Sequence, residues 1–338
     1  MGQPRNGNQK ACRQARSVIV HQVSASQESS GRVRLAITLG DVRGIGPEVI
    51  AKALADARLR SGNIEFVLVG PTGTSIDVDE SVGEWPAGAV GSALGSELHA
   101  RAGQLAGLAI ERAVSLVKTG RVQGIVTAPL DKSALHAGGY DYPGHTEMLA
   151  ALTGAHTTMM LASNVLRVVL ATTHIALRDV PAAVTAEAIA LAANGTRDGL
   201  RKWFGIQNPR LALCAMNPHA GDGGRFGDED DRILAPAARA NDLAGPFPAD
   251  TVFVRAMRGE FDAVIAPYHD VGMTAIKVAS FGSAVNVTLG LPFIRTSPDH
   301  GTALDIAGKG IADAGSMITA IEMARDCILR ALESKLKM

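Results

Sequence analysis

The sequence of 338 residues has few cysteines, few aromatic residues and no net charge. Its three cysteines, Cys12, Cys214 and Cys327, are far apart and lack a C-x-x-C spacing, which excludes a disulfide framework and a thiolate zinc site and favours a reducing compartment. The 33 basic residues balance 33 acidic ones, so the chain lacks the positive surface that binds nucleic acid. No apolar run reaches the length of about 18 residues that a membrane span requires. We therefore expect a cytoplasmic protein with neither a nucleic-acid nor a membrane partner.

The first 33 residues differ from the rest of the chain. Up to Arg34 the sequence carries six basic residues and one acidic residue, Glu28, together with a serine-rich stretch at 24–30. Transit peptides share this composition, but the segment has neither the apolar region of a secretory signal nor an amphipathic period. We therefore expect residues 1–33 to be a disordered extension or the product of an over-called start codon.

The remaining sequence predicts an α/β protein, because the chain is 46% hydrophobic and contains 37 glycines but only 13 aromatic residues. Short β-rich apolar runs alternate with helical patterns, as in parallel βα units. The expected strands cover residues 35–39, 64–69, 122–127, 166–172, 211–215, 263–266 and, as the last one, 283–289. The expected helices begin at 47 and then cover 98–117, 146–152, 185–203, 228–240, 250–258 and 316–336, and residues 71–96 are a candidate surface excursion.

Three of the nine histidines, His174, His219 and His269, follow apolar strands. The carboxyl ends of parallel strands meet at one edge of a sheet, where ligands bind, so the three imidazoles have a reason to converge. Neutral imidazoles suit a divalent ion such as zinc, cobalt, nickel or manganese and leave positions open for a substrate oxygen. The alternative is that each histidine makes only an ordinary hydrogen bond at a strand end. Asp270, beside His269, is a candidate general base or a residue that orients this ligand.

A fourth histidine, His145, lies in the segment Pro143-Gly-His-Thr-Glu147. Thr146 is able to cap the helix that follows, and the free N–H groups of a helix N-terminus can bind an anion. A capping turn alone explains the threonine but gives His145 no role.

Further anion-binding groups lie near strand ends in a part of the chain that is poor in charge: Lys277, Asn286 and Arg295. An ammonium, an amide and a guanidinium are the groups that a phosphate or carboxylate substrate requires, although each taken singly is more often a solvated surface group. The glycine-rich loop 300–310, which contains His300, Gly301 and Asp305, is a candidate nucleotide loop.

The turn Gly40-Asp-Val-Arg-Gly-Ile-Gly-Pro-Glu48 follows a strand and opens a helix, yet it matches neither the dinucleotide fingerprint G-x-G-x-x-G nor the P-loop. A tight strand-to-helix turn with proline at the first helical position explains most of it. The sequence also lacks a G-x-S-x-G elbow, which argues against a hydrolase.

Six motifs in this order resemble the 4-hydroxythreonine-4-phosphate dehydrogenase (PdxA) family over about residues 34–333. They are Gly40-Asp…Gly-Ile-Gly-Pro-Glu48, Pro143-Gly-His-Thr-Glu147, Ala171-Thr-Thr-His174, Asn217-Pro-His-Ala-Gly221, Tyr268-His-Asp270 and Leu289-Gly-Leu-Pro-Phe-Ile-Arg-Thr-Ser297 with Asp299-His-Gly-Thr-Ala303. Two segments depart from the common pattern. Val42-Arg43 stands where Pro-Ala is common, and Thr127-Ala-Pro-Leu-Asp-Lys132 is more similar to a second branch of the family, the threonate/erythronate 4-phosphate dehydrogenases.

The resemblance implies the isocitrate/isopropylmalate dehydrogenase-like fold, with two α/β domains and a cleft between them. The first domain would comprise residues 34–136 and 303–338, and the second residues 137–302. A homodimer would build each active site from both subunits. In matching positions, His174, His219 and His269 would bind one divalent metal ion, with one of the three reaching across the dimer.

The resemblance also implies the roles of the remaining candidates. His145, Thr146, Lys277, Asn286 and Arg295 would bind the substrate, and the loop with His300, Gly301 and Asp305 would bind NAD, with NADP as the alternative. The metal, zinc, cobalt, nickel, manganese or magnesium, would bind the secondary hydroxyl of the substrate while hydride passes to the nicotinamide, and the β-keto acid formed would lose carbon dioxide.

The expected substrate is therefore a phosphorylated four-carbon hydroxy acid, with 4-phosphothreonate or 4-phosphoerythronate ahead of 4-hydroxythreonine 4-phosphate. Three alternatives remain: a decarboxylating dehydrogenase of a cyclic cis-dihydrodiol dicarboxylate, a metal-dependent aldolase, isomerase or hydrolase that uses no nucleotide, and a non-catalytic protein that binds metal or phosphate.

Overall fold

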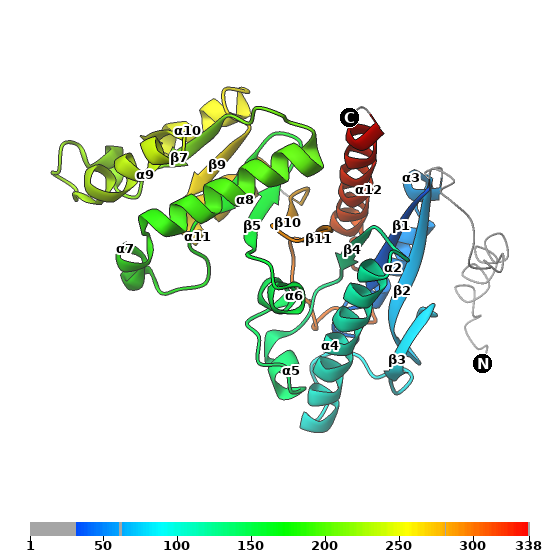
Figure 1. Cartoon of the computed structure of the whole chain (residues 1–338). Helices are drawn as coiled ribbons and strands as arrows, with labels where there is room; N and C mark the ends of the chain where they lie inside the picture. Colours follow the sequence, from blue (N-terminus) through cyan, green and yellow to red (C-terminus); the bar gives the residue numbers. More distant parts are fainter. Residues whose placement is uncertain (1–31, 61–62, 281, 337–338) are drawn as a thin grey trace.

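The computed structural model describes residues 32–60, 63–280 and 282–336 as strands and helices of one α/β structure (Figure 1). The strands are β1 (Val33–Thr38), β2 (Ile64–Thr72), β3 (Glu80–Glu84), β4 (Gly124–Thr127), β5 (Thr158–Ala162), β6 (Arg167–Leu170), β7 (Leu211–Cys214), β8 (Ala244–Phe247), β9 (Ala263–Ala266), β10 (Val285–Leu289) and β11 (Ile294–Pro298). The α-helices are α2 (Gly46–Ala55), α3 (Ala57–Arg60), α4 (Ser96–Lys118), α5 (Lys132–Ala137), α6 (His145–Thr153), α7 (Val180–Ala183), α8 (Ala186–Phe204), α9 (Ala235–Ala240), α10 (Ala249–Met257), α11 (His269–Ala279) and α12 (Gly315–Leu336). Two 3-10 turns, η1 (Leu177–Asp179) and η2 (Pro218–Gly221), and a π-helical turn, η3 (Asp230–Leu234), complete the described elements.

The strands form one mixed sheet of 11 strands in the order β3-β2-β1-β4-β11-β10-β5-β6-β9-β7-β8. The strands from β3 to β11 run parallel to one another, and so do the strands from β6 to β8. Between these groups, β10 and β5 pair antiparallel with each other and with their other neighbours. The three antiparallel pairs β11-β10, β10-β5 and β5-β6 each reverse the strand direction, so the two parallel groups run in opposite directions.

One face of the sheet is covered by a single continuous core. Its apolar side chains come from strands of both parallel groups, including Leu35, Val126 and Ile265, and pack under α2, α12, α8 and α9. The C-terminal helix α12 contacts β11, β10, β4 and β1 as well as α2 and α8, so it covers the first parallel group up to β10 and packs beside α8, which covers the strands beyond (Figure 1).

The other face carries two separate apolar clusters. One cluster places Ile125 and Phe293 under α4 and α6, and the other places Leu161 and Val264 under α10 and α11. Between the clusters this face is polar, because Asn286, Thr288 and Arg295 of β10 and β11 point away from α12. Most residues of the two strands that face α12 are apolar, and Thr296 donates to the carbonyl of Ala320 in α12. The gap between the clusters is therefore where a polar ligand would find polar partners.

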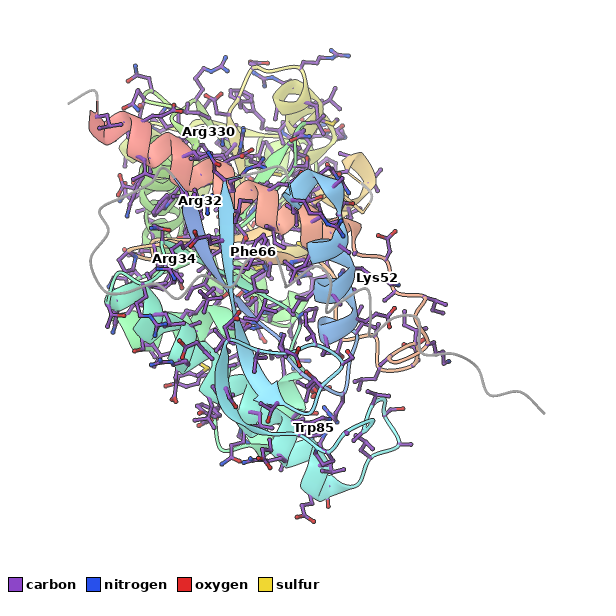
Figure 2. All side chains as sticks on the ribbon, turned by 90° about the vertical axis from the view of Figure 1, so that its right-hand side faces the viewer. Arg32, Arg34, Lys52, Phe66, Trp85 and Arg330 are labelled. Atoms are coloured by element: carbon purple, nitrogen blue, oxygen red, sulfur yellow. The ribbon has the colours of Figure 1, made fainter. Side chains whose placement is uncertain are left out.

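The structure confirms the α/β class but corrects several expected elements. Residues 283–289 do not form the last strand, because β11 follows and pairs with both β4 and β10. The stretch 71–96 contains an edge strand, β3, and the buried Trp85, whose Nε1 donates to the carbonyl of Ala89 at 2.8 Å (Figure 2). β5, β8, α3, α5, α7 and α11 have no counterpart among the expected elements, and the sheet is mixed where only parallel units were expected.

The expected extension at residues 1–33 falls almost wholly outside the described residues. Strand β1 begins at Val33, inside the assigned extension, because Val33 is fully buried and its N–H donates to the carbonyl of Asn63 at 2.8 Å. The two-domain division stays a prediction, and one sheet runs through both of its parts. None of the described helices is long and apolar enough to cross a membrane.

Helices α4 and α5 touch through their backbones. A Cβ atom added to Gly103 of α4 would lie 1.7 Å from the carbonyl oxygen of Ala134 in α5, and one added to Gly138 would lie 2.2 Å from the backbone nitrogen of Gln104. No side chain fits at either position, so glycine fixes the distance between the two helices.

We expect Gly103→Ala to lower the free energy of unfolding by about 1–3 kcal/mol, because the new methyl group must push the backbone of α5 away. Gly95→Ala is the matched control at the N-terminus of the same helix, since a Cβ atom there meets nothing within 4 Å. Urea unfolding curves of both variants test this. Equal midpoints for the two variants would contradict the close contact.

Candidate active site

His174 and His269 lie together beyond the ends of two neighbouring parallel strands, β6 and β9. Their ring centroids are 5.5 Å apart. The hydroxyl of Thr172 donates to the carbonyl of Pro267 at 2.7 Å, which ties the two loops that carry them. Such a convergence is expected for strands that share a direction, and the order β6-β9-β7 places the three histidine-bearing strands side by side.

The spacing of the two rings is close to that of two imidazoles bound to one metal ion. Two imidazoles bound to one tetrahedral ion have ring centroids about 5 Å apart, given metal–nitrogen bonds of about 2.1 Å. Asp270 Oδ1 lies 2.7 Å from Nδ1 of His269, which leaves Nε2 of His269 for an ion. Burial, followed by the charge of Lys132 and the neighbouring His269, lowers the pKa of His174, while Glu147 acts against this. A lowered pKa keeps the imidazole of His174 neutral, the form that binds a metal.

His219 does not join this pair within one chain. Its nearest described aromatic neighbour is Phe226, with ring centroids 6.5 Å apart. Among the residues that the structure describes, no three His, Cys, Asp or Glu side chains lie close enough to hold one ion. A single chain therefore supplies two of the three expected imidazoles at one place.

The loop that carries His219 has a strained backbone. His219, Ala220 and Asp222 have positive φ angles of 53°, 55° and 44°, which residues other than glycine rarely adopt. The loop is anchored by the buried carboxylate of Asp230, which accepts the backbone N–H groups of Met216 and Asn217 at 2.8 and 2.9 Å. Strain that is held in place in this way is common where a side chain is aimed at a ligand.

Arg295 is a buried cation at the centre of the sheet. Only 2% of this residue is exposed, and its guanidinium donates to the hydroxyl of Thr127 at 2.6 and 3.2 Å and to that of Thr288 at 3.0 Å. No carboxylate forms an ion pair with Arg295 among the described residues. Burial lowers the pKa of Arg295 to about 9, with Glu147 acting against the shift, so the group stays charged at neutral pH.

Asn286, Thr288 and Arg295 form a polar strip on one face of β10 and β11. Near this strip two buried polar atoms lack hydrogen-bond partners among the described residues: Nε2 of His145 and Oδ1 of Asn286. His145 begins α6, and burial, together with the charges of Arg295 and Lys132, lowers its pKa well below its usual range. Buried polar atoms without partners cost stability, so a ligand at this strip would gain by pairing with them.

Thr146 does not cap α6. The N-cap is Gly144, it has no side-chain cap, and Thr146 is the second helical residue. The expected capping turn is therefore wrong, because the helix begins one residue earlier than its apolar pattern indicates. The partly buried side chain of Thr146 stays a predicted substrate contact.

Lys277 and the expected nucleotide loop meet beside the end of β11. Nζ of Lys277 lies 3.3 Å from Oδ1 of Asp299, so this cation is paired. The neighbouring His300 has a buried Nε2 without a described partner, and its Nδ1 lies 3.0 Å from the carbonyl of Gly301. Asp305 and Gly301 are exposed. The structure places Asp305 in the same loop but shows no contact between Asp305 and the other candidates.

This loop is fastened to α2. Lys52 of α2, labelled in Figure 2, donates to the carbonyls of Gly310 and Ala312 at 2.9 and 2.6 Å. Glu48 accepts from the N–H of Ala312 at 2.9 Å. The N–H of Ile45 donates to the carbonyl of Thr302 at 2.9 Å. The turn that precedes α2 thus supports the loop after β11.

Four residues near the site were missed or left without a role: Thr127, Lys132, Glu147 and Thr288. Thr127 and Thr288 could have been found as polar residues inside otherwise apolar strands, where the alternation places them away from the α12 face. Lys132 and Glu147 lie within quoted motifs, but a single charge near a strand or helix end is a weak signal.

Comparisons with known proteins identify the family of this chain. Residues 47–324 match the family model of the pyridoxal phosphate biosynthetic protein PdxA. The chain is 43% identical over 325 residues to 4-hydroxythreonine-4-phosphate dehydrogenase of Beijerinckia indica, covering 86% of this chain and 94% of that protein. It is 42% identical over 331 residues to D-threonate 4-phosphate dehydrogenase of Cupriavidus necator, covering 88% of this chain and 97% of that protein.

Solved structures show the same fold. The crystal structure of 4-hydroxythreonine-4-phosphate dehydrogenase from Klebsiella pneumoniae aligns with a TM-score of 0.76 and 38% identity, over 90% of this chain and all of that chain. A terephthalate 1,2-cis-dihydrodiol dehydrogenase from Burkholderia xenovorans aligns with a TM-score of 0.59 and 26% identity, over 87% and 98% of the two chains. Isocitrate dehydrogenase from Methylococcus capsulatus, at 15% identity and a TM-score of 0.50 over 90% and 88%, shares the fold alone.

We expect His145→Gln to reduce the acid sensitivity of the protein. Because the pKa of His145 is lowered in the folded state, only the unfolded state binds this proton below pH 6.5, and the free energy of unfolding falls as the pH falls. Between pH 7.5 and 5.5 the wild type should lose about 1 kcal/mol more than the variant. Urea unfolding at the two pH values measures this, and equal losses would show that His145 is not held neutral.

Proposed function

The chain belongs to the PdxA family, and from this premise we propose that it is an NAD-dependent and divalent-metal-dependent dehydrogenase of a phosphorylated four-carbon hydroxy acid. The proposed reaction oxidises a secondary hydroxyl to a keto group, and the β-keto acid then loses carbon dioxide. D-Threonate or erythronate 4-phosphate is the preferred substrate, ahead of 4-hydroxythreonine 4-phosphate, because the segment 127–132 is more similar to that branch.

The observation that carries the proposal is the buried charge of Arg295. Its guanidinium is held by two threonine hydroxyls, and no described carboxylate neutralises it. A buried cation that lacks a counter-charge is expensive, so a bound anion would stabilise it. A phosphate or carboxylate oxygen at this strip could also accept from Asn286 and contact His145 and Thr146, as we propose for substrate binding.

We propose that His174 and His269 of one subunit and the partner subunit's His219 hold the metal ion. The support is that His174 and His269 form a pair of suitable spacing, whereas His219 lies away from them in the same chain. When bound, such an ion acts as a Lewis acid toward the substrate hydroxyl. Asp270 accepts from Nδ1–H of His269 and so orients the imidazole, which favours a positioning role over that of the general base.

We propose that the loop 300–310 binds the nicotinamide cofactor, with NAD preferred and NADP as the alternative. His300, Gly301 and Asp305 are its proposed contacts, and the buried free Nε2 of His300 supports a polar partner there. The bonds from Lys52 and Glu48 to the following segment keep the loop backbone in place. We also propose a homodimer and a cytoplasmic location, as expected from the sequence.

The alternatives from the sequence differ in what they leave unexplained. An aldolase or isomerase without nucleotide has no use for the loop 300–310. A non-catalytic binding protein disagrees with the dehydrogenase names of the relatives. A cyclic cis-diol dicarboxylate would place a carboxylate, instead of phosphate, at Arg295, and the substrate test below separates the two.

We expect the metal-loaded protein to reduce NAD with D-threonate 4-phosphate about a thousandfold more efficiently than with D-threonate, because a charged phosphate contact is worth several kcal/mol. Nicotinamide absorbance at 340 nm follows the reaction, and chelation should abolish it until a divalent ion is returned. Equal efficiencies for the two acids, or preference for a cis-dihydrodiol dicarboxylate, would contradict the phosphate assignment.

We expect a mixed dimer to recover activity. Co-expression of His219→Ala with His174→Ala chains gives heterodimers with one complete set of ligands, so about a quarter of the wild-type activity should return after random pairing. His174→Ala combined with His269→Ala is the control, because every site then lacks a ligand. No recovery in the first mixture would show that His219 serves its own subunit.

A further inference from the structure

The segment Asp131–Ser133 comprises the N-cap and the first two residues of α5, and it is held by hydrogen bonds on both sides of Lys132. The carboxylate of Asp131 accepts from the backbone N–H of Ala134 at 2.8 Å and from the hydroxyl of Ser133 at 2.6 Å. Ser133 Oγ in turn lies 3.3 Å from Nε2 of His99 in α4. The two neighbours of Lys132 in the chain are therefore hydrogen-bonded.

A buried ion pair between Arg43 and Asp41 supports this segment through His99. His99 Nδ1 lies 2.7 Å from the guanidinium of Arg43, which is paired with Asp41 at 2.6 Å, and both charged residues are at most 3% exposed. The N–H of Asp41 donates to the carbonyl of Pro129 at 3.0 Å. The chain Asp41–Arg43–His99–Ser133–Asp131 thus connects the turn before α2, helix α4 and the start of α5. Arg43 is one of the residues that departs from the common family pattern.

Lys132 itself has no hydrogen bond or ion pair within the described part of the chain. It is exposed, and its side chain reaches the turn before α6: a Cβ atom on Gly144 would lie 3.7 Å from Cε of Lys132 and 3.5 Å from Oε2 of Glu147. This turn leads directly into His145. The ammonium of Lys132 also lies near enough to act on both His145 and His174 electrostatically.

Apart from the proposed metal ion, the described side chains of the site supply less positive charge than the two anionic ends of the proposed substrate carry. A phosphate monoester carries a charge of about −1.5 to −2 at neutral pH, and the carboxylate adds one more. Arg295 provides one positive charge, and Lys277 is paired with Asp299. Lys132 is a cation beside the site that no described carboxylate neutralises.

We propose that Lys132 is a further substrate-binding residue, whose ammonium holds an anionic oxygen of the substrate between His145 and the His174–His269 pair. The proposal deepens the proposed function and rests on it. The hydrogen-bonded neighbours of Lys132 position its backbone, so the flexible side chain loses less freedom when it binds. The anionic oxygen belongs either to the carboxylate or to the phosphate, and the two ends can be separated experimentally.

The test measures binding by calorimetry to the metal-loaded dimer in the absence of nucleotide. The probes are D-threonate 4-phosphate, which carries both anionic ends, and erythritol 4-phosphate, which lacks the carboxylate. Lys132→Met should weaken binding of the first probe about 10- to 100-fold, as expected for a hydrogen bond to a charged group. Lys132→Arg should retain most of the affinity, since it keeps the charge.

Lys118→Met is the matched control, because Lys118 lies at the opposite end of α4 from His99 and donates to the carbonyl of Leu152. Weaker binding of only the acid assigns Lys132 to the carboxylate, and equal weakening of both probes assigns it to the phosphate. Unchanged affinity of Lys132→Met for both probes, with tight binding by the wild type, overturns the proposal alone. Wild-type protein that binds neither probe overturns the proposed function and this inference with it.

Discussion

The arrangement of the site depends on the desolvated charge of Arg295. A guanidinium buried in the middle of an 11-stranded sheet needs hydrogen-bond partners, and the hydroxyls of Thr127 and Thr288, on the two strands that flank β11, accept from three of its five N–H groups. Hydroxyls satisfy the N–H groups without cancelling the charge. The free protein therefore keeps an electrostatic field at the strip, ready for an anion, and no rearrangement of a protein carboxylate is needed when a ligand binds.

The sheet provides the room for this charge by an asymmetry between its faces. Under α12 the core continues from one parallel group to the other, whereas on the opposite face the apolar clusters are separate. The antiparallel strands β10 and β5 lie at this junction and bring Thr288 and Asn286 beside Arg295. The continuous core holds the two groups together, and between the two separate clusters of the opposite face the buried side chains are polar, among them Thr288 and Arg295.

Much of the fold could be predicted from the sequence, because long βα patterns and the family motifs carry strong local signals. The family and the α/β class are confirmed, and the adjacency of His174 and His269 follows from strand direction. The strands β5, β10 and β11 form an antiparallel junction whose pairing is set by residues far apart in the chain, so periodicity did not reveal it. Lys277 looked like a free cation because its partner, Asp299, lies 22 residues away. In the proposed dimer His219 binds the metal ion held by the other subunit, so its place relative to that ion depends on how the two chains associate. No local pattern in a single sequence indicates this.

The backbone contact between α4 and α5 has an evolutionary consequence. Because Gly103 and Gly138 leave no space for a side chain, selection cannot shift α5 gradually by enlarging or shrinking residues at the contact. Descendants of this chain that drift toward another substrate would keep the helix where it is and exchange the residues that begin it, at 131–133. Branches with different substrates should then differ in the side chains of this short segment, while the backbone of α5 keeps its position.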